Sequence, residues 1–172
     1  MANYVVFIYG TENTTVDQLH VLPFSLNQQQ LAIPLAEVVK VLPALLWTPL
    51  PGAPGSVDGV INIQGVPLVQ INLARCFGWP APPLQLWRPL LWLQLKRRQV
   101  LIPVDAVAPV FAVDGAVLLN NANPQINSKL LKGVICTDHG MLLIQDLELL
   151  LSDADESLLQ AALAQAADLV QP

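Results

Sequence analysis

Short apolar runs separated by turn-forming residues dominate the chain. The clearest is residues 50–73, LPGAPGSVDGVINIQGVPLVQINL, in which Asp58 is the only ionisable residue. This pattern predicts two short buried strands, residues 60–63 and 67–73, joined by a tight Gln-Gly turn at residues 64–65. Glycine in the turn permits a positive φ, which a two-strand reversal requires. The segment is therefore expected to form a β-hairpin.

Three further hairpins follow from the same alternation of apolar runs and turns. They comprise strands 20–26 and 30–35 around a turn at 27–29, strands 86–95 and 100–104 around 96–99, and strands 133–137 and 141–144 around 138–140. Residues 105–113 are expected to extend the strand that begins at residue 100. Smaller elements are a strand or single helical turn at 36–42, a helical turn at 74–77 and an N-terminal strand at 4–9.

Two helices are expected at the C-terminal end of the chain. Residues 145–151 form a short one that is apolar on one side. Asp153 can cap the last helix, with Glu156 three residues on as its capping-box partner. An apolar stripe at helical spacing then comprises Leu158, Leu159, Ala162, Leu163, Ala166, Leu169 and Val170. The stripe favours packing against the strands, and a partner-binding helix is the alternative.

The two halves of the chain resemble each other. Each opens with a hairpin that runs into an apolar segment and ends with a second hairpin and a short helix. Many short strands, with turns about every 8–12 residues, are typical of small barrels. We therefore predict a mainly β fold of two small β-barrels. Its parts are an N-terminal arm at 1–19, a main domain at 20–152 of two interleaved barrel subdomains with an approximate divide near residues 80–85, and a C-terminal helix at 153–172.

Composition limits the possible partners. The chain has 172 residues, of which 53% are hydrophobic and 12% charged, so it is far too apolar for disorder and has apolar surface beyond its core. The net charge of −5 argues against nucleic acid as the main partner. Neither a transmembrane helix nor a signal peptide is predicted, so we expect a cytoplasmic protein without direct membrane insertion. Cys76 and Cys136 stand alone in the sequence and are interpreted as structural thiols.

The sequence contains no pattern that predicts catalysis. Its only histidines are His20 and His139, and the Asp-His-Gly run at residues 138–140 is better explained as a turn. Two histidines and two scattered cysteines do not make a zinc site, and no phosphate-binding loop occurs. Asp105 and Asp146 are expected to form turns or cap helices. We therefore predict no catalytic, cofactor or metal site, and a protein that works by contact rather than as an enzyme.

An ordered set of motifs resembles the CheW-like adaptors of bacterial chemosensory systems. The family pattern is a Pro-containing loop, then GviNlRG, a PviDL strand and a short helix that ends in FG. The corresponding residues here are Pro54, 59–65 (GVINIQG), 67–73 (PLVQINL) and 77–78 (FG). Further matches are the hairpin at 24–41, VDAV at 104–107, KGV at 132–134 and LLIQDL at 142–147. The resemblance runs in order from about His20 to Leu151.

The resemblance implies two five-stranded, SH3-like barrels and a non-enzymatic role. Members of this family couple transmembrane chemoreceptors to a CheA-type histidine kinase. One surface binds the regulatory domain of the kinase, and another binds the cytoplasmic tip of a methyl-accepting chemoreceptor. These two proteins are the expected partners, and no cofactor is implied.

Three positions depart from the family pattern. Gln64 replaces the usual Arg, Lys40 aligns with a usual acidic residue, and Asn72 replaces the usual Asp. The changes indicate either drift on a tolerant surface or an altered partner, because one unpaired buried charge would be costly. The expected partner-binding residues are Lys40, Val60, Asn62, Gln64 and Gly65, with Lys40 beside the turn. Alternation along the strand places either Val60 or Ile61 in the core.

A second hypothesis keeps the fold and changes the function. Trp47, Trp79, Trp87 and Trp92 would line an apolar cavity, and the protein would bind a small hydrophobic ligand. Aromatic side chains at strand and loop positions are more often part of a core or an interface. The adaptor is therefore the leading hypothesis and the ligand-binding barrel the alternative.

Overall fold

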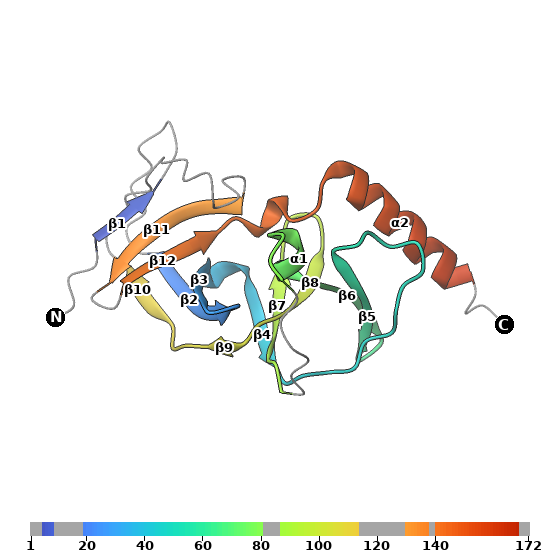
Figure 1. Cartoon of the computed structure of the whole chain (residues 1–172). Coiled ribbons are helices and arrows are strands. Elements are labelled where there is room, and N and C mark those ends of the chain that lie inside the picture. Colours follow the sequence, from blue (N-terminus) through green and yellow to red (C-terminus); the bar gives the residue numbers. More distant parts are fainter. Residues whose placement is uncertain (1–4, 9–18, 81–86, 114–129, 138–139, 169–172) are drawn as a thin grey trace.

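Two mixed β-sheets form the body of the protein (Figure 1). The computed structural model describes residues 5–8, 19–80, 87–113, 130–137 and 140–168. The predicted turn residues 138–139 and the last two stripe residues, 169–170, lie outside these ranges. The expectation of a mainly β fold with few short helices is confirmed.

The first sheet, named sheet I, has the strand order β1-β11-β12-β3-β2-β10, and β9 also pairs with β2. Its strands are β1 (Val5–Ile8), β2 (Leu19–Leu26), β3 (Gln29–Pro34), β9 (Ala106–Val107), β10 (Phe111–Val113), β11 (Leu131–Thr137) and β12 (Gly140–Gln145). Hairpins β2–β3 and β11–β12 are antiparallel, and the β12–β3 pair that joins them is parallel.

The second sheet, sheet II, has the strand order β4-β7-β8-β6-β5. Its strands are β4 (Val38–Leu42), β5 (Val57–Ile63), β6 (Val66–Ile71), β7 (Leu90–Gln94) and β8 (Gln99–Pro103). Here too one parallel pair, β6–β8, joins two antiparallel hairpins. Each sheet therefore contains two hairpins joined in parallel, to which sheet II adds β4 and sheet I adds β1, β9 and β10. The shared arrangement of hairpins accounts for the similarity of the two halves of the sequence.

The two sheets interleave along the chain. Strands β5 and β6 precede the expected divide near residues 80–85 and strands β7 and β8 follow it, yet all four belong to sheet II. Sheet I takes its strands from both sides of this central block. The sheets are therefore nested along the chain, with strands of sheet II on both sides of residues 80–85, while the domain boundaries themselves stay a prediction.

Two strand assignments from the sequence need correction. Residues 105–113 do not extend β8, because β9 and β10 both pair with β2 of sheet I. The chain turns away at Asp105, whose backbone N–H donates to the carbonyl of Ser25 at 2.8 Å. Strand β7 begins at Leu90 rather than at residue 86, since Trp87 is 89% exposed and precedes the paired residues.

One apolar cluster joins the two sheets. It includes Phe24 of sheet I and Leu91 of sheet II, which are both almost completely buried. Smaller clusters belong to one sheet each, around Ile135 in sheet I and Leu101 in sheet II. The shared cluster fixes how the sheets pack on each other, because burial of its side chains is the main stabilising term.

The helical elements within the described residues are η1 (Leu35–Glu37), α1 (Leu73–Cys76), η3 (Leu147–Leu149) and α2 (Asp153–Asp168). The predicted cap of α2 is displaced by one residue. Ser152 Oγ accepts from the Asp155 N–H at 3.1 Å, and Asp155 accepts from the Ser152 N–H at 3.3 Å. The capping box is therefore Ser152 with Asp155. Glu156 instead pairs with Arg98 on the β7–β8 turn.

Candidate partner-binding surface

The β5–β6 turn has the backbone conformation of a tight hairpin. Gln64 and Gly65 both have positive φ, 53° and 88°, as a type I′ turn requires. Asn62 stabilises the turn, because its Oδ1 accepts a hydrogen bond from the Gly65 N–H at 2.8 Å. Asn62, Gln64 and Gly65 are all exposed. The predicted turn is thus confirmed, and it presents uncharged polar groups to solvent.

Alternation along β5 divides its residues between core and surface. Ile61 is 4% exposed and belongs to the cluster of sheet II, whereas Val60 is half-buried. Val66, the first residue of β6, is 48% exposed. The expectation that one of Val60 and Ile61 belongs to the core is confirmed, and Ile61 is that residue. The tip of the hairpin therefore combines exposed polar atoms with one exposed valine.

Gly59 allows the segment after β4 to approach β5 closely. Thr48 and Val60 exchange two backbone hydrogen bonds, each 2.8 Å long. A Cβ atom on Gly59 would lie 2.1 Å from the Thr48 carbonyl oxygen and 2.9 Å from Cε3 of Trp47. No side chain fits there, so the glycine is required by the contact itself. The bridge links the chain that leaves β4 to the opposite edge strand, β5.

Lys40 does not lie on the β5–β6 hairpin. It is exposed on β4, where its register partner is Trp92 of β7. Strands β4 and β5 are the two ends of the strand order of sheet II, so three strands separate them in the sheet. No ion pair within the described part of the chain involves Lys40. The structure thus brings Val60, Asn62, Gln64 and Gly65 together and places Lys40 on the other edge strand.

A polar cluster behind the hairpin accounts for the departure at Asn72. The Asp58 side chain, only 8% exposed, pairs with Arg75 at 3.1 Å. It also accepts from Gln70 Nε2 at 2.9 Å and from Asn72 Nδ2 at 3.4 Å. Asn72 also caps α1, because its Oδ1 accepts from the Arg75 N–H at 3.2 Å. Asp58 therefore supplies the carboxylate in this cluster, while Asn72 serves as donor and cap.

Sequence reasoning did not assign this role to Asp58. The available signal was its isolation, since it is the only ionisable residue in the apolar run 50–73. A lone acid in such a run needs a partner when it is buried. Arg75, seventeen residues on, is the nearest basic residue that follows it in the sequence.

The other titratable side chains that the sequence singled out have structural roles. Asp105 accepts from the Asn27 N–H at 2.7 Å and pairs with Arg88 at 2.6 Å. Asp146 caps η3 by accepting from the Glu148 N–H at 3.3 Å. Burial raises the pKa of the Cys76 thiol from its ordinary value of 9.0 to about 11, so the thiol is protonated at neutral pH. Within the described ranges, no three His, Cys, Asp or Glu side chains are grouped to hold a metal.

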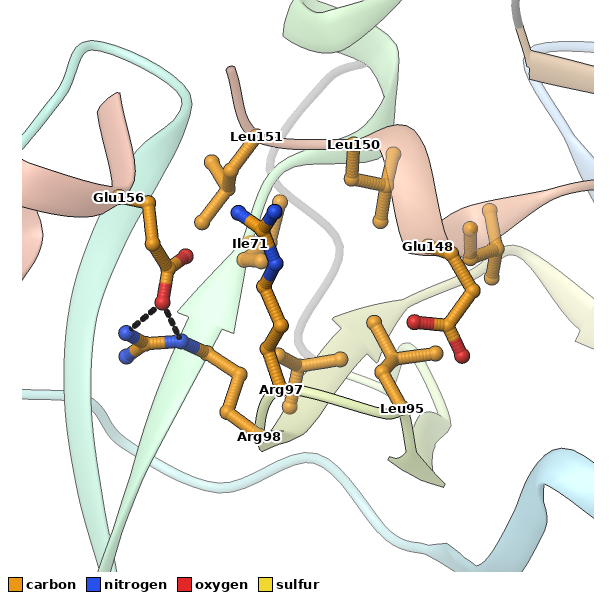
Figure 2. Close-up of a pocket in the computed structure, with 10 residues that line it drawn as sticks. Ile71, Leu95, Arg97, Arg98, Glu148, Leu150, Leu151 and Glu156 are labelled. Carbon is orange, nitrogen blue, oxygen red and sulfur yellow. Dashed lines mark hydrogen bonds and ion pairs between the residues drawn. The ribbon is translucent and has the colours of Figure 1, made fainter. Parts of the chain in front are cut away.

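The four tryptophans do not gather around one cavity. Trp87 and Trp47 are 89% and 43% exposed, and Trp79 packs against Phe77 with ring centroids 4.6 Å apart. Trp92 donates from Nε1 to Gln99 Oε1 at 3.1 Å. The shallow pocket between α2 and the β7–β8 turn is lined by none of them (Figure 2). These positions give no support to the ligand-binding barrel.

Comparison with known proteins gives consistent matches. The CheW-like domain family matches residues 20–155. The Probable chemotaxis protein CheW of Rhizobium etli is 26% identical over 155 residues, which cover 86% of this chain and 96% of that protein. The Chemotaxis protein CheW of Thermotoga maritima is 26% identical over 137 residues, which cover 79% and 89%.

The fold has a solved counterpart as well. The crystal structure of the scaffolding protein TtCheW from Thermoanaerobacter tengcongensis superposes with a TM-score of 0.73 at 22% identity, over 80% of this chain and 94% of that one. No helix within the described residues has the length and apolar character to span a membrane. With the family match extending over most of its length, the chain belongs to the CheW-like domain family.

Proposed function

We propose that this protein is a non-catalytic cytoplasmic adaptor that couples a chemoreceptor to a CheA-type histidine kinase. The kinase would bind through its regulatory domain and the receptor through its cytoplasmic tip. Membership of the CheW-like domain family carries the proposal. The titratable groups support it, because the carboxylates described above form ion pairs, turns and caps, and the thiol of Cys76 is protonated. The adaptor would hold its two partners together, so that shifts in the receptor bias the kinase.

The proposed contact residues are Val60, Asn62, Gln64 and Gly65, together with Lys40 on β4. The first four lie on one rigid hairpin whose turn is held by the Asn62–Gly65 hydrogen bond. A preorganised turn loses little conformational freedom on binding, which favours affinity. Lys40 would contribute to a separate part of the contact, because β4 is the opposite edge strand of sheet II.

An altered choice of partner follows from the charges at this surface. The turn offers the uncharged Gln64 where the family usually has Arg, and β4 offers the cationic Lys40 where an acid is usual. Charge patterns at an interface determine partner choice and encounter rate more than total affinity. We therefore propose that the kinase or the receptor of this system carries matching changes at the surfaces that meet Gln64 and Lys40.

Isothermal titration of the chain with its co-encoded kinase regulatory domain and receptor tip tests the proposal. Gln64→Arg places a full charge in the contact and is expected to change the Kd for one partner by about tenfold. Gln28→Arg is the matched control. Gln28 is likewise exposed and has a positive φ of 65°, but it lies in the β2–β3 turn of sheet I. Equal effects of the two variants would contradict the proposed site, and a folded wild type that binds neither partner would contradict the proposed function.

A further inference from the structure

Helix α2 connects the two sheets at the end of the chain. It follows β12 of sheet I through η3, yet it packs along sheet II (Figure 1). Leu159 and Ala162 are its fully buried apolar side chains, and Leu163 is partly buried against the shared cluster. Leu158, in contrast, is 53% exposed. A sixteen-residue helix is therefore anchored by a small apolar contact.

Three residues of the β7–β8 turn bind η3 and the first turn of α2. Arg97 Nη1 lies 2.8 Å from Asp153 Oδ1, and the Nε and Nη2 atoms of Arg98 both donate to Glu156 Oε1 (Figure 2). The Lys96 N–H donates to both carboxylate oxygens of Glu148, at 2.9 and 3.0 Å. We call these six residues the clasp: Lys96, Arg97, Arg98, Glu148, Asp153 and Glu156.

The contacts of the clasp differ in burial. The side chains of Arg98 and Glu156 are only 17% and 13% exposed, whereas those of Arg97 and Asp153 are 60% and 90% exposed. An exposed pair contributes little and is screened by salt, while a partly buried pair leaves an unpaired charge when one partner is removed. The Arg98–Glu156 pair is therefore the contact on which the clasp depends.

The clasp and the apolar contact hold only the first two-thirds of α2. Three acidic side chains lie in the first turn of α2, whereas its last turn carries no basic residue. Ala162 lies near Gly52, where an added Cβ would be 4.0 Å from Ala162 Cβ. Gly52 belongs to the segment that leads into β5. The helix thus touches the β7–β8 turn at its start and this segment near its middle.

We propose that α2 is a detachable strap, which leaves sheet II as a unit when the clasp is weakened while both sheets stay folded. Release breaks no strand pairing, because α2 follows the last strand and its contacts with sheet II are made by side chains. Elements with few buried contacts open locally at a lower free energy than the whole domain. Release uncovers the apolar side chains that sheet II contributes to the pocket, which include Ile71 and Val100, and frees the segment before β5.

Hydrogen exchange of the full chain, followed by mass spectrometry, tests the strap. Arg98→Gln is expected to increase exchange of the α2 amides about tenfold, since one partner of a partly buried charge pair is lost. Exchange of β2 and β3 amides stays unchanged. Raising the salt from about 0.1 M to about 1 M shortens the screening length from about 10 Å to about 3 Å and moves the wild type in the same direction.

Arg88→Gln is the matched control. Arg88 pairs with Asp105 at 2.6 Å with side-chain exposures of 14% and 25%, which are similar to those of Arg98 and Glu156, but the pair lies away from α2. The double variant Arg98→Glu with Glu156→Arg should restore protection of α2. Equal exchange of α2 in Arg98→Gln and Arg88→Gln, or faster exchange only together with β2 and β3, would overturn the proposal. If Arg98→Gln does not fold, Glu156→Gln removes the other partner of the same pair and allows the same comparison.

Discussion

Replacing Gly59 by alanine would force β5 away from the segment that follows β4. The new Cβ would lie 2.1 Å from the Thr48 carbonyl oxygen and 2.8 Å from the carbonyl carbon. Both are backbone atoms, so no side-chain rotation can relieve the clash. The segment around Thr48 can move away from β5 only by lengthening the hydrogen bonds between Thr48 and Val60. The substitution is therefore expected to open the contact between β5 and the segment that follows β4.

The loss of stability has two contributions, which are the steric clash and the two weakened hydrogen bonds. Overpacking at a buried site costs about 1–3 kcal/mol, and the loss of each backbone hydrogen bond adds about 1 kcal/mol. The free energy of unfolding should fall by about 3–5 kcal/mol, against a total of about 5–15 kcal/mol for a typical domain. In a chain of this size the melting temperature should fall by about 10 °C.

Thermal and urea unfolding followed by circular dichroism measure the difference. Gly55→Ala is the control, because no atom lies within 4 Å of its added Cβ and the residue is exposed. That variant is expected to remain within about 1 kcal/mol of wild type. Equal melting temperatures for Gly59→Ala and Gly55→Ala would refute the close approach of Thr48 to β5.

Two further predictions concern the polar cluster and the buried thiol. Asn72→Asp keeps the cap of α1 but adds a second carboxylate beside Asp58, so stability at pH 7 should fall by about 1 kcal/mol, and urea unfolding at high salt, which screens the repulsion, should show a smaller loss. An equal loss at low and high salt would contradict the electrostatic explanation. Burial keeps Cys76 protonated, so wild-type stability should decrease by about 2 kcal/mol more than that of Cys76→Ala as the pH rises from 9 to 11, because the unfolded thiol ionises from the beginning of this range and the folded thiol only near its end. Parallel pH profiles of the two proteins would contradict this pKa.

The hairpins were predictable because the residues that determine them are close together in the sequence. The β5–β6 turn carries glycine at a position with φ of 88°, and alternation along β5 correctly divides Val60 from Ile61. Residues 105–113 were wrongly assigned because nothing local distinguishes an extension of β8 from pairing with β2. That pairing joins Ala106 to Ser25, which are far apart in the sequence. Nesting of the sheets likewise depends on contacts between distant segments.

The cap of α2 was also mispredicted because a contact with a distant residue decides it. Both Ser152 with Asp155 and Asp153 with Glu156 satisfy the spacing of a capping box. Glu156 is drawn away by Arg98, fifty-eight residues earlier, and that contact decides between them. In the candidate surface, the turn was predictable from sequence, but the placement of Lys40 on the other edge strand depends on the strand order of sheet II.

We propose that the chain bridges two partners that do not assemble without it. Size-exclusion chromatography of the co-encoded kinase regulatory domain and receptor tip, with and without the chain, tests this bridge. The two partners are expected to elute together only when the chain is present. Co-elution of kinase and receptor in its absence, or separate elution of both in its presence, would show that the chain is not the bridge between them.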